Sequence, residues 1–107
     1  MLKERVFIMS NIRSLLSAYQ GKIFVYLATA EISRQFLQDA ENEGFTFGDG
    51  VKPTQRPTSD IFAIHPDMTL NYVGFAGHIA YRLADRIGDQ PLWKIDYREL
   101  LKGNSRP

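Results

Sequence analysis

Residues 22–47 read KIFVYLATAEISRQFLQDAENEGFTF, and this stretch decides the fold class. The segment from Lys22 to Ala28 is almost continuously apolar, which is typical of a strand covered on both faces. At Thr29 the pattern changes to helical spacing, with Thr29 as the N-cap and Gly44 at the left-handed position that ends many helices. Phe45 to Phe47 then alternate as a short strand does. The stretch predicts one strand-helix-strand element with both helix ends marked.

The helix predicted between these marks has a buried stripe and an acidic end. Its apolar residues at helical spacing are Ile32, Phe36, Leu37 and Ala40. Residues 23–50 carry five carboxylates against one arginine, and most of the carboxylates lie near the C-terminal end of this helix. We regard this acidic end as one candidate for binding specificity.

Similar signals predict the elements on either side. Residues 10–19 suit a helix that is capped by Ser10 and ended by Gly21. Two runs, 60–65 and 69–75, are strand-like and are separated by Pro66-Asp67-Met68, which predicts an antiparallel hairpin.

The C-terminal third is predicted to hold a helix, a strand and a short second helix. The apolar residues that share one face of the first helix are Ala76, Ile79, Ala80, Leu83 and Ile87, and Gly88 marks its end. Trp93, Ile95 and Tyr97 alternate as a last strand. Asp96 and Glu99 have capping-box spacing, so a short helix is expected to begin near Tyr97.

The predicted order α-β-α-β-β-α-β-α matches a two-layer α+β sandwich of the ferredoxin-like type. We expect an antiparallel or mixed sheet of about four to five strands with helices on one face. The sequence leaves open whether 45–47 or 60–65 is the second strand, and a less regular α+β sheet is the alternative. We expect one domain over residues 1–107.

The two ends of the chain carry separate expectations. Two interpretations of residues 1–8 stay open, because they could be a leader before a start at Met9 or an extension of the first helix. The tail at 103–107 is predicted to be disordered.

Composition excludes several classes of function. With 44% hydrophobic and 23% charged residues, the chain is too apolar to be disordered. It has no cysteine, which excludes disulfides, thiolate metal sites and thiol nucleophiles. No apolar run approaches the ~18 residues of a membrane span. These features predict a cytoplasmic protein that is not bound to a membrane.

Few residues have the spacing of a catalytic or metal site. His65 and His78 are the only histidines and lie thirteen positions apart, without metal-ligand spacing around either. Asp49, Asp60 and Asp67 lie in predicted turns, where aspartate commonly accepts backbone N–H bonds. We therefore predict no catalytic residue, metal or cofactor. A small enzyme that uses either histidine with an aspartate is a minor alternative.

Two groups of residues favour anion binding. Gly74, Gly77 and His78 lie where a strand passes into a helix, and the free N–H groups of a helix start can hold an anion. Lys52 and Arg56 form a small basic cluster on the long 48–59 loop. Together they indicate an alternative function, the binding of anions, nucleotides or nucleic acid.

The aromatic content favours a different function. The predicted strands carry apolar residues on both faces, which is more apolar surface than helices on one face can cover. We expect Phe62, Tyr72 and Trp93 to form an aromatic patch on the open sheet face. The preferred prediction is a non-enzymatic interaction module that forms a homodimer or binds another protein through this patch. The loop or the acidic helix end would supply specificity.

Overall fold

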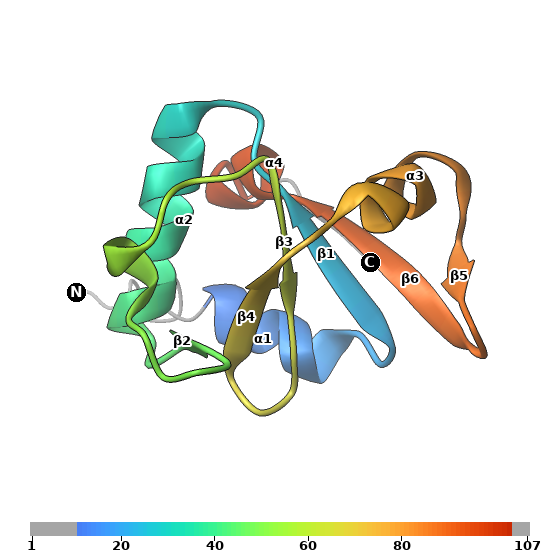
Figure 1. Cartoon of the computed structure of the whole chain (residues 1–107), viewed down its shortest axis with the longest axis horizontal. Helices are drawn as coiled ribbons and strands as arrows, with labels where there is room; N and C mark the ends of the chain where they lie inside the picture. The colour runs from blue at the N-terminus through green and yellow to red at the C-terminus, as the bar shows by residue number, and fades with distance from the viewer. Residues whose placement is uncertain (1–10, 104–107) are drawn as a thin grey trace.

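The computed structural model of the protein describes residues 11–103 (Figure 1). The expectations for residues 1–8 and for 104–107 lie outside this range. Within the described range, four α-helices and a mixed sheet of six strands are formed. The helices are α1 (Asn11–Ala18), α2 (Ala30–Asn42), α3 (Phe75–Leu83) and α4 (Tyr97–Leu101), with one 3-10 turn, η2 (Pro53–Gln55). The strands are β1 (Lys22–Tyr26), β2 (Thr46–Phe47), β3 (Ile61–Ile64), β4 (Thr69–Tyr72), β5 (Arg86–Ile87) and β6 (Gln90–Asp96).

The sheet has the strand order β2-β4-β3-β1-β6-β5, with β1 near its centre. β1 pairs antiparallel with β3 and parallel with β6. The expected number of strands was too low, because the two-residue edge strand β5 lies where the sequence predicts the end of a helix, whereas the short edge strand β2 falls in the predicted segment 45–47. The ferredoxin-like expectation is also wrong. In that fold all neighbouring strands are antiparallel, whereas here β1 and β6 are parallel neighbours, and so are β2 and β4.

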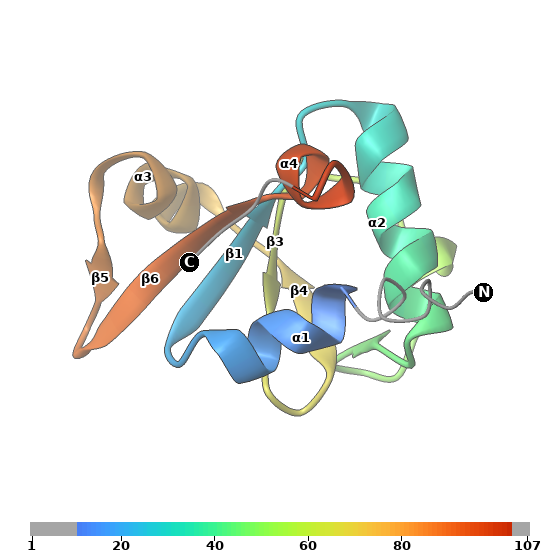
Figure 2. The same ribbon diagram turned by 180° about the vertical axis from the view of Figure 1, so that it is seen from behind.

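Helices cover both faces of the sheet, not one. Side chains alternate along β1, so Ile23 and Val25 pack in the core under α1, α2 and α4. Phe24 points to the opposite face, where it packs with residues of α3. Figures 1 and 2 show α3 on one side of the sheet and α1 and α4 on the other. Because both faces are covered, every residue of β3 is buried.

The residues predicted to begin and end α2 are confirmed. Thr29 Oγ1 accepts the Ile32 N–H at 3.1 Å, and Gly44 follows the helix with φ +98°. The buried residues of α2 are Ser33, Phe36, Leu37 and Ala40, while Ile32 is only partly buried. Local sequence signals therefore determined this element.

The acidic end of α2 is used inside the fold. The Glu43 carboxylate accepts the N–H groups of Ile12 and Arg13 at 3.2 and 2.8 Å, so it caps the first turn of α1. Burial raises the pKa of Glu43, against the opposing effect of these hydrogen bonds. Asp39 accepts the Tyr97 O–H at 2.5 Å and Glu41 accepts the Thr54 hydroxyl at 2.7 Å. These three carboxylates, at the C-terminal end of α2, thus hydrogen bond to α1, η2 and α4.

The C-terminal third differs from its prediction at one point. The helix that was expected to reach Ile87 ends at Leu83, and Ala84 is already extended. Arg86 and Ile87 instead form β5, which turns back through Gly88 at φ +61° to pair with the start of β6. The short last helix is confirmed, because α4 begins after Asp96, whose side chain accepts the Arg98 N–H at 3.0 Å.

Candidate functional site

The helix α3 lies on the sheet through Gly77, Ala80 and Tyr81. Gly77 packs closely on Val73, and Ala80 and Tyr81 pack against the core that contains Phe24. The Tyr81 ring lies 5.9 Å from the Tyr26 ring. Of the nine residues of α3, all within the described range, none is buried. The helix is thus attached through a narrow contact.

The opposite side of α3 is an exposed apolar stripe. Phe75, Ile79 and Leu83 are 82%, 41% and 79% exposed. They are spaced at i, i+4 and i+8, so they line one face of the helix. We call these three residues the α3 stripe. A contiguous row of large apolar side chains in water is typical of an interaction site, whereas single exposed ones are ordinary.

The Gly77 contact allows a test of which side of α3 faces the sheet. A Cβ at position 77 would overlap Val73 Cγ1 and lie 3.6 Å from the Phe24 ring. We expect Gly77→Ala to lower the free energy of unfolding by about 1–2 kcal/mol, because the overlap outweighs the gain in helix propensity. Chemical denaturation measures the change in the free energy of unfolding. Ala76→Gly, at the exposed neighbouring position, measures the effect of helix propensity alone. A Gly77→Ala variant more stable than the parent would contradict the packing.

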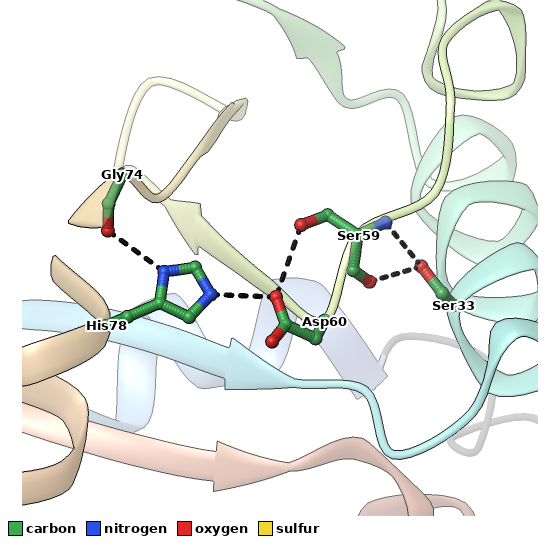
Figure 3. A network of polar contacts seen from close by, with 5 residues as sticks. All are labelled: Ser33, Ser59, Asp60, Gly74 and His78. Carbon is green, nitrogen blue, oxygen red and sulfur yellow. Dashed lines mark hydrogen bonds and ion pairs between the residues drawn. The ribbon is translucent and has the colours of Figure 1, made fainter.

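A polar network holds the N-terminal end of α3 to the start of β3 (Figure 3). His78 Nε2 lies 2.8 Å from Asp60 Oδ1, and His78 Nδ1 lies 2.9 Å from the Gly74 carbonyl oxygen. Ser59 donates its hydroxyl to the same Asp60 oxygen at 3.4 Å. Ser33 Oγ donates to the Ser59 carbonyl at 2.7 Å and accepts the Ser59 N–H at 3.2 Å. The network connects α2, β3 and α3.

The network contains serine, aspartate and histidine, but its geometry is not that of a catalytic triad. A carbonyl and a carboxylate can only accept, so both contacts of the His78 ring are hydrogen bonds only when the ring is protonated, and they favour its charged form. A triad histidine must instead offer a free nitrogen to the nucleophile. Among residues 11–103, the serine that contacts this pair is Ser59, which bonds to Asp60 and not to the ring. The arrangement therefore differs from a triad, in which the serine hydroxyl contacts the histidine.

The charge pair makes stability depend on pH. Its hydrogen bonds to Gly74 and Asp60 raise the pKa of His78 above 6.5, and the bond from His78 lowers the pKa of Asp60 below 3.8. The histidine contribution is complete below pH 6.5 and is lost as pH rises through the raised pKa. The aspartate contribution is complete above pH 3.8 and is lost as pH falls through the lowered pKa. The pair is therefore strongest between these values.

We expect His78→Gln to lower the free energy of unfolding by roughly 0.5–1 kcal/mol at pH 5.5, a small value because both side chains are over a third exposed. The difference from the parent should shrink at pH 9, where His78 loses its charge. Denaturant unfolding at both pH values measures it, with His65→Gln as the control. An equal difference at both pH values would show that the ring contributes only by packing.

The residues predicted to bind anions lie at the start of α3. Gly74 and Gly77 line an open groove of 270 Å³, whose lining includes both Phe24 and Val73 and the polar residues Lys22 and His65. His78, predicted to join them, has its charge paired with a carboxylate. An anion at this helix start would lie close to that carboxylate, which is unfavourable.

The basic loop has one paired and one exposed cation. Arg56 donates to Asp49 at 2.5 Å, and its guanidinium lies 5.0 Å from the centre of the Phe47 ring. Bonds from the Val51 N–H and from Arg56 lower the pKa of Asp49. Lys52 is exposed next to η2. The loop is fastened to the fold and offers a weaker positive field than its sequence predicts.

The residues of the predicted aromatic patch do not form one exposed surface. Phe62 is fully buried under α2, where its ring stacks on Phe36 at 5.7 Å. Tyr72 is 38% exposed and donates its hydroxyl to the Pro57 carbonyl. Trp93 lies beyond β1, half-buried, with its Nε1 donating to the Gln20 carbonyl at 2.9 Å. The expectation that Phe62 lies at the surface is wrong, because helices cover this face of the sheet.

The two histidines are kept apart. His65 follows β3 and contacts Asn71 through Nε2, whereas Asp60, the partner of His78, precedes β3. A four-residue strand separates these positions by roughly 16 Å. His65 and the partner of His78 therefore lie at opposite ends of β3.

Sequence reasoning missed the α3 stripe, although the signal was present. Helical periodicity places Ile79 and Leu83 on one helical face together with Ala76, Ala80 and Ile87, and it does not indicate which side of the helix meets the sheet. Phe75 was assigned to the preceding strand. The spacing of Phe75, Ile79 and Leu83 could have identified the stripe, since small residues between them mark the side that approaches the sheet.

Comparison of the chain with protein-family models, with curated proteins and with solved structures gave no match. Roles of residues therefore rest on the geometry described above. Among residues 11–103, no helix has the length and hydropathy needed to cross a bilayer.

Proposed function

We propose that this protein is a non-enzymatic interaction module whose α3 stripe binds the apolar surface of another polypeptide. The observation that supports this most strongly is the exposure of Phe75 and Leu83, at 82% and 79%. Burying each such side chain against a partner contributes about 1.5–3 kcal/mol to binding. The rest of the helix is already held by Gly77 and by the His78–Asp60 pair, so docking needs no change of fold.

The orientation of the stripe supports the same proposal. The face of α3 that packs on the sheet carries Gly77, Ala80 and Tyr81, and the apolar side chains of Phe75, Ile79 and Leu83 on the other face are turned to water. A helix with this distribution is typical of helix-mediated recognition, in which residues at i, i+4 and i+8 act as anchors. The alternative, anion or nucleic-acid binding, has less support because Arg56 and His78 already have acidic partners.

Site-specific photo-crosslinking in the producing cells tests the proposal. A photoreactive phenylalanine analogue at position 75 should give crosslinked protein adducts, and Leu83→Ser should reduce them. The same analogue at Ser17, which is exposed on α1, is the matched control. Equal or absent adducts at the two positions, in protein that folds normally, would contradict the proposed function.

A further inference from the structure

The α3 stripe is symmetric about its central residue. Phe75 and Leu83 each lie four residues from Ile79, which is about 6 Å along the helix axis. A second copy of the helix laid antiparallel on the first would place Ile79 against Ile79 and each Phe75 against the other copy's Leu83. A surface that matches itself in this way is what a two-fold symmetric interface requires.

We infer, on the basis of the proposed function, that the partner is a second copy of this chain, joined through antiparallel α3 helices with the two-fold axis at Ile79. The homodimer expected from the sequence is thereby moved from the sheet aromatics to the outer face of α3.

Charge favours the antiparallel direction. Arg82 is exposed in the last turn of α3, and the Asp60 carboxylate, 57% exposed, lies near its N-terminal end. Asp60 uses one oxygen, Oδ1, for both His78 and Ser59. An antiparallel pair brings the Arg82 end of each copy toward the Asp60 end of the other, and it opposes the two helix dipoles. A parallel pair would instead place Arg82 beside Arg82.

The exposed apolar area of the α3 stripe limits the affinity of the proposed dimer. From their exposed fractions, Phe75, Ile79 and Leu83 offer on the order of 350 Å² of apolar surface per copy. Two copies thus bury less than the ~1,200 Å² at which stable interfaces begin. We therefore expect a dimer that exchanges with monomer and is populated at micromolar and higher concentrations.

Disulfide crosslinking tests the geometry, because a chain without cysteine gives each variant a single thiol. Two α3 helices packed about 8–10 Å apart bring facing Cα atoms to about 3.5–5.5 Å, which overlaps the Cα separations of disulfides. Ile79→Cys should therefore crosslink with itself under mild oxidation. Phe75→Cys and Leu83→Cys should each crosslink poorly alone, since their own copies lie about 12 Å apart along the axis, but readily when mixed.

The outcomes separate this inference from the proposed function. Self-crosslinking of all three variants at similar rates would indicate parallel helices and would overturn the inference. A dimer whose Ile79→Cys variant crosslinks no faster than the exposed Ser17→Cys control would also overturn it. Photo-crosslinking at position 75 to a different protein, with a chain that stays monomeric at 1 mM, would overturn the inference while the proposed function stands. All three α3 positions are exposed, so the variants leave the core intact.

Discussion

Replacing Phe62 with alanine is expected to lower the free energy of unfolding by about 3–5 kcal/mol. Phe62 is fully buried, and its ring contacts Phe36 at 5.7 Å, Tyr72 at 4.9 Å and Phe47 at 6.1 Å. Removal of the ring leaves a cavity between α2 and the sheet. A domain of this size is stable by only about 5–15 kcal/mol, so the loss is a large fraction of the total.

Phe75→Ala is the matched control for this prediction. It deletes the same atoms at a site that is 82% exposed. The free energy of unfolding of the monomer should change by no more than about 0.5 kcal/mol. Chemical denaturation below 1 µM keeps self-association from contributing. If Phe62→Ala costs less than about 1 kcal/mol, or if the two variants are equally destabilised, then the assignment of the buried and exposed aromatic residues is wrong.

Replacing Leu83 with aspartate should weaken self-association by at least about 100-fold. The reason is that a two-fold interface contains the residue twice, so each dimer loses two buried leucines at about 1.5–3 kcal/mol apiece. Leu83 is 79% exposed in the monomer, so the change should leave the fold intact. Sedimentation equilibrium over a range of concentrations gives the dissociation constant.

Leu101→Asp serves as the control for Leu83→Asp. Leu101 is also an exposed leucine, 45% accessible, but it belongs to α4 on the other side of the sheet. The same charge introduced there should leave the dissociation constant within about threefold of the parent. Equal weakening by both substitutions would mean that net charge, and not the α3 stripe, controls association.

Local signals were sufficient for α2 but not for α3. The ends of α2 are set by Thr29 and Gly44, which act on backbone groups within a few residues, so the sequence alone predicts them. The face of α3 that is buried depends on how closely the helix approaches the sheet. Gly77 permits that approach, and helical periodicity grouped Ala80, which packs on the sheet, with Ile79 and Leu83, which are exposed.

The sequence predicted most of the segments that form strands, but not which way their side chains point or which distant residues they meet. All four residues of β3 are apolar, so no alternation showed that Phe62 points toward α2 and Ala63 toward α3. Likewise, the cap of α1 comes from Glu43, about 30 residues away, and the partner of His78 is Asp60, 18 residues away. Tertiary contacts of this range leave no local pattern in a single sequence.

The polar network has a structural role that follows from the protonation of His78. Both acceptors of His78 are oxygen atoms that cannot donate, so they raise the pKa of the ring, and the protonated ring ties the N-terminal end of α3 to β3. The tie keeps the weakly packed helix in place while its outer face stays in water. This accounts for a helix that has no buried residue and nevertheless presents an ordered apolar row.

A methyl NMR dilution series of the full chain tests the central claim, that the outer face of α3 joins two copies of this protein. With dilution from 1 mM to 10 µM, the methyl signals of Ile79 and Leu83 should shift together along one binding curve, while those of Leu101 and of the buried Leu70 stay fixed. Signals of Ile79 and Leu83 that do not move, in a sample that dimerises through other residues or stays monomeric, would contradict it.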